Sequence, residues 1–478
     1  MIFAIRSGAI AVAASLAVGC ASAPKDAGFA DVRRAVLEET RQPVEWDPSK
    51  PVEPLDDARV APLMTGELTV DRAVQVAFAN NRDVQATLEE LGIARGDLLA
   101  AGTIRNPIFH AEIRFAGDVA NPIEFGLAQT LVDIFHLKNR KRLGRAQFDA
   151  ARTRVAAAVM HFAGQVRTDY FDLLAARKVL ARQDTMMKGQ EASTDLARRQ
   201  HAAGNISDLD LENEQSRYEQ AKLDHARAQL EELETRERVI SDLGLVQRAE
   251  LALPADFPSP EPTEPTSAEV EERALARRLD VRIARSEIEA AERGIPIART
   301  LFLEEAELGV HHEREPEGLT TTGPEITGPI PIFDRGAADR TRARAMLRQA
   351  QQRLAAISVS ARSEARSALE RLREARARVD YLRDVVIPRR DRILRLTQLE
   401  YNAMLLGVFH LIEARQNLAQ AQREHIVAER DYWVARTELD TAILGVGGFS
   451  VRPEGAERRR LELFAGPRPP QTSADEGK

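Results

Sequence analysis

The sequence is poor in cysteine, in aromatic residues and in clustered histidine, and these shortages exclude several classes of protein. One cysteine and nine histidines are scattered along 478 residues, so no cluster has the spacing of metal ligands. Aromatic residues make up only 5% of the chain and charged residues 29%, a balance typical of long exposed helices. No glycine-rich phosphate loop or nucleophile elbow occurs. We therefore predict that the chain is not an enzyme and holds no metal or cofactor.

Charge of one sign is not concentrated anywhere, and long apolar runs are absent beyond the first twenty residues. The formal net charge of −7 comes from 67 basic and 74 acidic residues that are mixed along the sequence. Without a basic patch, nucleic acid is not expected as a partner. After Cys20 no run of about 18 apolar residues occurs, so no transmembrane helix is predicted. Such a chain would cross a membrane only as strands that close into a barrel.

The single cysteine ends a secretory signal. Residues 1–20 read MIFAIRSGAIAVAASLAVGC, with Arg6 in the n-region, an apolar core and small residues before Cys20. The last residues resemble a lipobox, in which the cysteine is acylated and becomes the new N-terminus. Ala17 stands where leucine is more usual, so a plain signal peptide is the alternative. Ala21 follows the cysteine in place of aspartate, which favours sorting of a lipoprotein to the outer membrane.

Proline divides the chain into segments. Five prolines fall within residues 43–62, a second proline-rich stretch occupies 254–265, and none occurs between Pro122 and Pro254. The predicted organisation is a signal peptide (1–19), a lipid-anchored leader (20–66), a first repeat (67–253), a linker (254–267), a second repeat (268–446) and a disordered tail (447–478).

The proline-free span carries a sustained apolar spacing of three and four residues, which is typical of a coiled coil. A helix from about Leu137 to Ala203 would be roughly 100 Å long at ~1.5 Å per residue. Gly204-Asn205 breaks it, and the second half repeats the arrangement with a break near Gly407 and a kink expected at Pro388. The first seam comprises Phe148, Val155, Val159, Phe162, Val166, Tyr170, Leu173, Leu180 and one polar member, Arg177.

Landmarks outside these helices recur about 200 residues apart. NNRDV ending at Val84 corresponds to ARRLDV ending at Val281, and LVDIF ending at Phe135 corresponds to IPIF ending at Phe333. DLGL at 242–245 corresponds to ILGV at 443–446. A period of this length over most of the chain indicates an internal duplication.

Two short stretches precede the long helices of each half. Residues 109–115 and 123–128 alternate apolar side chains with charged or small ones, and weaker alternation covers 307–311 and 326–332, where prolines interrupt it. The pattern fits barrel strands with a lipid face and a lumen face. It fits half-buried strands of a soluble sheet equally well. Four strands cannot close a barrel wide enough for a channel, so a channel would need several chains.

The breaks in the long helices carry a specific resemblance. AGNISDLDLENEQSRYEQAKLDHA at 203–226 resembles the first hairpin tip of the TolC family of outer membrane efflux proteins, and YNAMLLGVFHLIEARQNLAQAQ at 401–422 resembles the second. The resemblance covers about residues 66–446. Tyr401 begins the family's Tyr-x-x-Gly turn, but Met404 replaces the glycine and Gly407 comes three residues later. This departure leaves the turn geometry and partner specificity of the second tip open.

The resemblance implies a mainly α fold of two coiled-coil hairpins, with four strands per chain that contribute to a twelve-stranded barrel in a homotrimer. It implies an outer-membrane channel that passes small solutes or metal ions from a periplasmic adaptor and an inner-membrane pump, expected here to be of the RND type. The hairpin tips would dock the adaptor through Gly204, Asn205, Ile206, Ser207, Asp208, Leu209, Tyr401, Asn402, Leu405, Leu406, Gly407 and Val408.

Charged residues near the tips are candidates for a periplasmic gate. Carboxylates there would form threefold rings or hold the gate through pairs with arginine. On a solvated coiled coil most charges simply face outward, which is the alternative for each of them. The candidates are Asp208, Asp210, Glu400 and Glu413, with Arg199, Arg395 and Arg415 as partners.

Other interpretations stay open. A periplasmic adaptor or structural coiled-coil lipoprotein without a pore would share the anchor and a hairpin, although an adaptor normally inserts one hairpin in a β-rich body. His311-His312 beside Glu313 points to a metal, but a solvated loop is the more frequent outcome in a predicted strand-to-loop segment. Tyr170 and Phe171 lie at the seam and are expected in the core.

Overall fold

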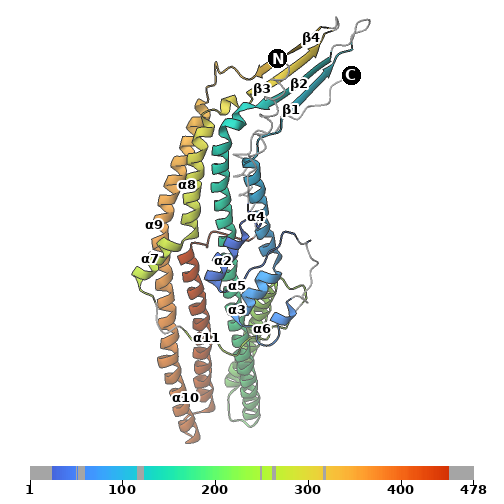
Figure 1. Cartoon of the computed structure of the whole chain (residues 1–478). Helices are drawn as coiled ribbons and strands as arrows, with labels where there is room; N and C mark the ends of the chain where they lie inside the picture. The colour runs from blue at the N-terminus through green and yellow to red at the C-terminus, as the bar shows by residue number, and fades with distance from the viewer. Residues whose placement is uncertain are drawn as a thin grey trace.

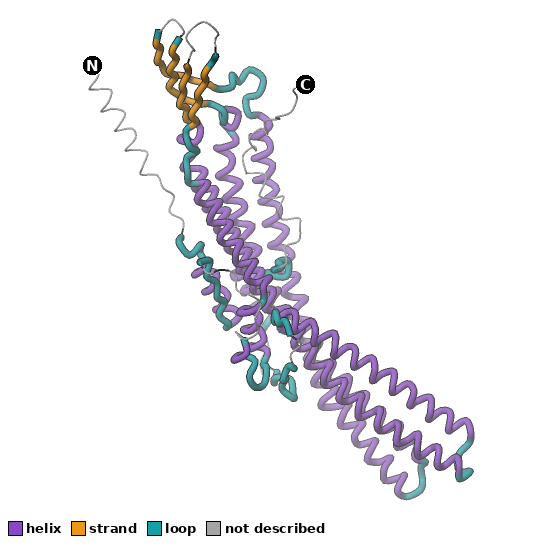
Figure 2. The backbone as a smooth tube through the Cα atoms, turned by 90° about the vertical axis from the view of Figure 1, so that its right-hand side faces the viewer, coloured by secondary structure: helices purple, strands orange, loops and turns teal. Residues whose placement is uncertain are grey.

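The computed structural model describes residues 24–49, 51, 60–115, 123–247, 250–260, 265–315 and 319–451, and it is strongly elongated (Figure 1). A small sheet lies at one end, the tips of two helical hairpins lie at the other, and short helices pack beside the middle (Figure 2). The signal peptide, Cys20 and nearly all of the predicted disordered tail fall outside the described residues, so the expectations for them stay predictions.

The same order of elements occurs twice. Two leading helices, two strands and a long hairpin make up each half, which confirms a mainly α fold built from two repeats. Helix α2 (Phe29–Thr40) and the 3-10 turn η2 (Ala61–Leu63) precede both. The first half has α3 (Val70–Asn80), α4 (Arg82–Ala101), β1 (Ile108–Ile113), β2 (Ile123–Thr130), α5 (Leu131–Ala202) and α6 (Asp208–Asp242). The second has α7 (Ser267–Arg277), α8 (Leu279–Ala298), the 3-10 turn η3 (Leu301–Leu303), β3 (Glu307–Arg314), β4 (Thr320–Thr327), α9 (Ala337–Tyr381), the π-helix η4 (Leu382–Val386), α10 (Ile387–Asn402) and α11 (Val408–Leu444).

Helix α5 is the spine of the molecule. It runs for 72 residues, and the seam predicted from the sequence is buried from Phe148 to Leu173. Its one polar member is explained by the segment that follows α6, because Arg177 donates a hydrogen bond of 2.6 Å to the carbonyl oxygen of Leu251. Tyr170 is 1% exposed and its hydroxyl donates to the carbonyl oxygen of Leu68 at 2.8 Å, so this residue lies in the core as predicted. No helix among the described residues is both long and apolar enough to span a membrane.

Aromatic side chains join the two halves at mid-length. Phe171 of α5 stacks on Trp433 of α11 with ring centroids 5.3 Å apart, and Tyr432 packs edge-on against Trp433 at the same distance. Aromatic pairs of this kind add about 0.5–1.5 kcal/mol beyond the area they bury. Phe257, from the linker between the repeats, also stacks on Phe171. Trp433 packs against two hydrophobic clusters, one mainly from the first half and one from the second, and so connects the cores of the two halves.

The four strands form one antiparallel sheet in the order β1-β2-β3-β4. The central pairing of β2 with β3 joins the two halves. The fourth strand was expected over 326–332, and this prediction is wrong, because β4 spans Thr320–Thr327. Pro329 and Pro331 carry no N–H for a ladder, whereas the threonines at 320–322 are β-branched and suit a strand.

One further expectation needs correction. Phe135 lies inside α5, but Phe333 precedes α9, so this pair of landmarks is not structurally equivalent. The prolines and Gly336, whose φ of 72° marks the start of α9, keep that segment out of the helix. Within the predicted leader, α2 packs on α5 with Val32 and Val36 fully buried.

Each half closes where its return helix meets its leading helices. In the first half, Asn81 caps α4 with its side-chain oxygen and donates from Nδ2 to the carbonyl oxygens of Ser241 and Asp242. In the second half, Arg278 occupies the corresponding place and donates to the carbonyl oxygen of Ala442 at 3.2 Å. This guanidinium is only 4% exposed and binds Asp280 at 2.6 Å and Glu364 at 2.8 Å.

Candidate functional site

The sheet carries most of its large apolar side chains on one face, and they are exposed in the single chain. Strand register places Phe109, Leu127 and Val310 side by side, with exposed fractions of 66%, 53% and 55%. Phe109 also stacks on Phe125 with centroids 6.2 Å apart. Such a surface needs an apolar environment to cover it. Its apolar members are Phe109, Ala111, Ile113, Ile123, Phe125, Leu127, Leu308, Val310, Pro324 and Ile326.

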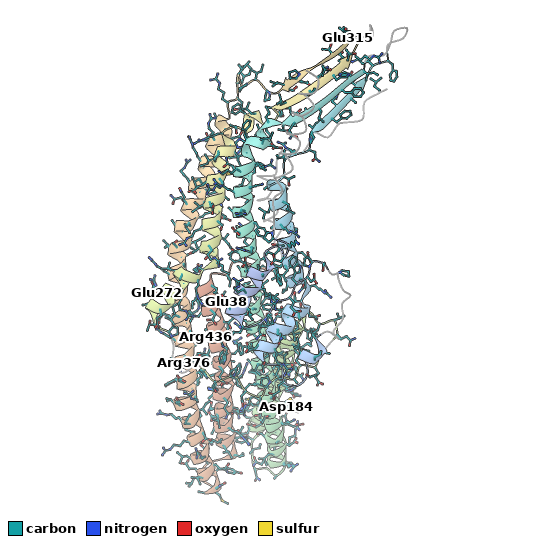
Figure 3. All side chains as sticks on the ribbon, in the orientation of Figure 1. Glu38, Asp184, Glu272, Glu315, Arg376 and Arg436 are labelled. Atoms are coloured by element: carbon teal, nitrogen blue, oxygen red, sulfur yellow. The ribbon has the colours of Figure 1, made fainter. Side chains whose placement is uncertain are left out.

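The opposite face is charged and lined with small residues. Glu112, Glu124 and Glu313 lie in one row across β1, β2 and β3, and His110 and His311 flank Gly126 in the next row. These rows lie toward the end of the sheet that is far from the helices, where Figure 3 labels Glu315 just beyond β3. The alternation seen in the sequence therefore corresponds to one apolar face and one charged face of the sheet.

Both outer edges of the sheet are open. Within the described part of the chain, β1 pairs only with β2, and β4 pairs only with β3. An open edge presents unpaired N–H and C=O groups that readily pair with another strand. The sheet is therefore incomplete by itself, on its apolar face and along both edges.

The first hairpin tip turns between Ala203 and Ser207. Gly204 adopts a φ of 74°, and the N–H of Asn205 donates to the carbonyl oxygen of Gln200, a helix ending in which glycine is favoured. Ser207 caps α6 in a reciprocal capping box with Asp210. Hydrogen bonds from the Ser207 hydroxyl and then from its N–H hold the pKa of the Asp210 carboxyl below its usual range.

The second tip makes the same turn with different residues. Met404 adopts a φ of 60°, and the N–H of Leu405 donates to the carbonyl oxygen of Glu400, as in the first tip. The replacement of glycine by Met404 has therefore not altered the turn geometry that the sequence left open. Gly407 precedes α11 without a side-chain cap. Met404 is 94% exposed and Leu405 is 74% exposed, so this tip is the more apolar of the two.

The candidate gate residues are not brought together within one chain. Among the described residues, no ion pair joins Asp208, Asp210, Glu400 or Glu413 to Arg199, Arg395 or Arg415. Asp208 accepts from His201 at 2.6 Å instead, and Arg395 pairs with Asp391 on its own helix. Threefold rings between chains stay a prediction.

Sequence reasoning missed one cluster on the polar face of the sheet. His311 was expected between a strand and a loop, but it lies within β3 and points to the face opposite His312. Its imidazole comes close to Glu124 of β2, 187 residues earlier in the chain. The alternation in 109–115 and 307–311 indicated which residues share a face of a strand. The contact between His311 and Glu124 depends in addition on the register between β2 and β3, which the sequence does not give.

Comparison with known proteins agrees with this architecture. The family model described as outer membrane efflux protein matches residues 73–245 and 270–445. The cobalt-zinc-cadmium resistance protein CzcC of Cupriavidus metallidurans is 23% identical over 393 residues, which cover 80% of this chain and 90% of that protein.

Solved structures share the fold. The CmeC outer membrane channel of Campylobacter jejuni is 15% identical, with a TM-score of 0.67 over 88% of this chain and 98% of that one. The open state of the MtrE outer membrane channel of Neisseria gonorrhoeae is 17% identical, with a TM-score of 0.63 over 80% and 91%. The matched residues include both repeats, their strands and both hairpin tips, and so the chain belongs to the outer membrane efflux protein family, the TolC family, whose members are efflux channels rather than enzymes.

Proposed function

We propose that three copies of this chain form a channel in the outer membrane that releases metal ions or small solutes received from a periplasmic adaptor and an inner-membrane pump. The observation that carries the proposal is the incomplete sheet. One face offers exposed apolar side chains to lipid, the other offers charge to an aqueous lumen, and neither edge strand has a second partner among the described residues. Strands from neighbouring chains would complete the sheet into a closed barrel of twelve strands.

The second hairpin supports assembly from several chains. Its predicted seam is buried at Leu372 and Val379, but toward the tip the side chains of Ile393, Leu396 and Leu399 are 42%, 51% and 64% exposed in one chain. A stripe of this kind on a long helix is normally covered by a neighbouring helix. A homotrimer covers it with the next chain and gives a helical tunnel below the barrel.

The cargo is inferred from the relative CzcC, which is named for resistance to cobalt, zinc and cadmium. We propose divalent metal ions as the first cargo to test and an RND pump as the source of energy. The adaptor would dock on the hairpin tips, because Leu405, Met404 and Leu209 expose apolar surface there. Cys20 would carry the lipid that anchors the chain in the outer membrane.

The test of the channel is single-channel conductance in a planar bilayer, combined with the mass of the purified protein in detergent. We expect discrete current steps from a species near three times the chain mass of 53.0 kDa. A monomer that extracts without detergent and never conducts would leave only the pore-less coiled-coil interpretation.

A matched pair of variants tests the two faces of the sheet. Leu127→Arg places a charge on the apolar face and should cost about 2–4 kcal/mol near the membrane midplane, so trimers should be lost from the outer membrane. Ala128→Arg adds the same charge one residue later, on the polar face, and should leave the trimer intact while changing its conductance. Equal effects of both variants would contradict the assignment of the faces.

Docking of the adaptor is tested by cross-linking. Since Cys20 is the only cysteine, Leu405→Cys adds one defined thiol at the second tip. We expect it to cross-link to a periplasmic protein in cells that actively export metal, whereas Leu223→Cys, exposed on α6 away from the tip, should not. Absence of a product from both positions during active efflux would refute docking at the tip.

Cys20→Ser should abolish incorporation of labelled fatty acid if the anchor is present.

A further inference from the structure

The polar face of the sheet gathers two imidazoles and three carboxylates from both halves of the chain. Register places His110 and His311 on either side of Gly126, and Glu112, Glu124 and Glu313 in the adjacent row. Gly126 adds no side chain between the two imidazoles; a Cβ built there would lie 3.7 Å from the Cβ of His110 and 4.0 Å from Oε2 of Glu325, so the Glu325 carboxylate of β4 also borders this position. The five side chains are defined below as the strand cluster.

Distances within the strand cluster suit a bound cation. Nδ1 of His311 lies 3.5 Å from Oε1 of Glu124, and Nε2 lies 3.7 Å from Oε2 of Glu313. Nε2 of His110 lies 3.8 Å from Oε2 of Glu112. One ligand atom each from His110, Glu112 and Glu124 can be chosen so that all lie within 4.8 Å of one another. Ligands bound tetrahedrally at ~2.0–2.2 Å lie about 3.4 Å apart, so these three side chains would have to approach one another to bind a cation, and His311 and Glu313 lie outside this set.

Arg114 orients the carboxylates and leaves their other oxygens free for a cation. Its Nε donates to Oε1 of Glu112 at 2.7 Å, and its second guanidinium nitrogen donates to Oε2 of Glu124 at 3.1 Å. The oxygens that face the imidazoles are the opposite ones, Oε2 of Glu112 and Oε1 of Glu124. Fixing of ligating carboxylates by an outer hydrogen bond is a common feature of metal sites. Arg114 is thus a positioning residue and not a ligand.

The charge of the cluster favours cation binding. Three carboxylates lie in adjacent register positions, and like charges placed directly across neighbouring strands destabilise a sheet. One guanidinium offsets only part of that repulsion, and a divalent cation would offset more. A solvated polar wall would also place charge on this face, but it would not require imidazoles beside carboxylates in adjacent rows. Mixed imidazole and carboxylate ligands suit zinc and similar transition metals better than magnesium or calcium.

We propose that His110, Glu112 and Glu124, with His311 and Glu313 beside them, bind a first-row divalent cation such as Zn²⁺ or Co²⁺. This goes against our expectation from the sequence that the chain holds no metal. The role of the site rests on the proposed channel, in which the polar face lines the lumen and three chains present three such sites. The side chains are half-buried or exposed, which matches a site that cations enter and leave during transit.

Metal binding to the full-length protein in detergent tests the site. After removal of bound metal with a chelator, Zn²⁺ is titrated by calorimetry, and Co²⁺ by visible absorption, which reports nitrogen ligands at the metal. We expect saturable binding near one ion per chain. The double variant His110→Ala/His311→Ala should weaken Zn²⁺ binding by at least about tenfold, the lower end of the cost for loss of an outer-shell partner. Glu124→Gln should weaken it comparably.

His312→Ala is the matched control, since His312 is the next residue on β3 but lies on the opposite face. It should leave the Zn²⁺ affinity unchanged. Unchanged affinity in the double variant, or equal losses in His311→Ala and His312→Ala, would overturn the proposal.

Conductance recorded on the same preparations separates the two proposals. A wild-type trimer that conducts but binds no Zn²⁺ would refute the cation site and leave the channel standing. A protein that binds Zn²⁺ through these residues and never conducts would refute the channel and leave the site standing.

Discussion

The two hairpin tips follow the same path with unlike residues. Gly204 and Met404 occupy the same position, with φ of 74° and 60°, and both helices end with the same backbone hydrogen bonds. The first tip has a glycine in the left-handed conformation and a capped return helix, whereas the second has methionine there and Gly407 in the capping position. The second tip therefore maintains its turn against the local preference of its residues.

The closing junctions differ in the same manner. A neutral amide, Asn81, binds the end of α6, and a buried guanidinium, Arg278, binds the end of α11. Gly244 and Gly445 follow the two return helices with positive φ, and both positions lack room for a side chain: a Cβ would lie 2.9 Å from the backbone of Asn80 at Gly244 and 2.5 Å from Asp280 at Gly445. The two halves thus share the same backbone path at this junction, and different side chains make the hydrogen bonds that close it.

The largest difference in unfolding free energy between matched variants is expected at these junctions. Arg278→Ala should cost about 2–3 kcal/mol of unfolding free energy, since it leaves Asp280 and Glu364 without their shared cation. The value lies below that of a fully buried pair because Glu364 is 52% exposed. Asn81→Ala should cost about 1–2 kcal/mol through the lost cap and two amide hydrogen bonds. Denaturant unfolding of the detergent-solubilised protein measures both, and a larger loss for Asn81→Ala would reverse the comparison.

Exchange of the residue at the turn should act in opposite directions at the two tips. Gly204→Met should destabilise the first tip by about 1–2 kcal/mol, the cost of a non-glycine residue in the left-handed conformation. Met404→Gly should stabilise the second tip by about 1 kcal/mol. Hydrogen exchange of amides in the two tips reports each change locally. Met404→Ala keeps the backbone cost and serves as the control; if it protects the second tip as much as glycine does, backbone strain is not the cause.

A smaller effect is expected at the capping positions. Ser207→Ala should cost the first tip about 1 kcal/mol, whereas Gly407→Ser should gain only a few tenths of a kcal/mol at the second. The same exchange experiment measures both, read at the first amides of α6 and α11. No change for Ser207→Ala would show that the capping box contributes nothing in the assembled protein.

The smallest expected difference is a response to acid. The folded-state pKa of Asp210 is lowered by its hydrogen bonds with Ser207, so this carboxylate contributes stability above its unfolded pKa of about 3.9. That contribution is lost as pH falls through the lower folded-state pKa. Below pH ~4 the first tip should therefore lose protection, after correction for intrinsic exchange, while the uncapped second tip changes less. Parallel loss at both tips would assign the effect to assembly instead.

Periodicity alone predicted the elements whose burial repeats regularly. The seam from Phe148 to Leu173 and the strands β1 and β2 follow from spacing, because each apolar position faces one partner surface. Strand β4 was misplaced, since its outer residues are threonines without apolar alternation. The conformation of Met404 is set by the whole hairpin and opposes local propensity, so the sequence left it open.

The strand cluster shows the other limit of sequence reasoning. His110 and Glu124 belong to the first half and His311 to the second, and their approach depends on the register between β2 and β3. The spacing of residues within either half contains no such information. Contacts between tip residues of different chains, including the gate candidates, likewise cannot be predicted from the spacing of residues in one sequence.

The π-helix η4 divides the outgoing helix of the second hairpin, whereas α5 of the first half is one continuous α-helix. A π-turn closes its hydrogen bond over one more residue than an α-turn. An inserted residue absorbed in this way does not rotate every later side chain by about 100° around the helix axis. Such a bulge lets one copy of a duplicated helix take up an extra residue while its downstream seam keeps facing the same neighbours.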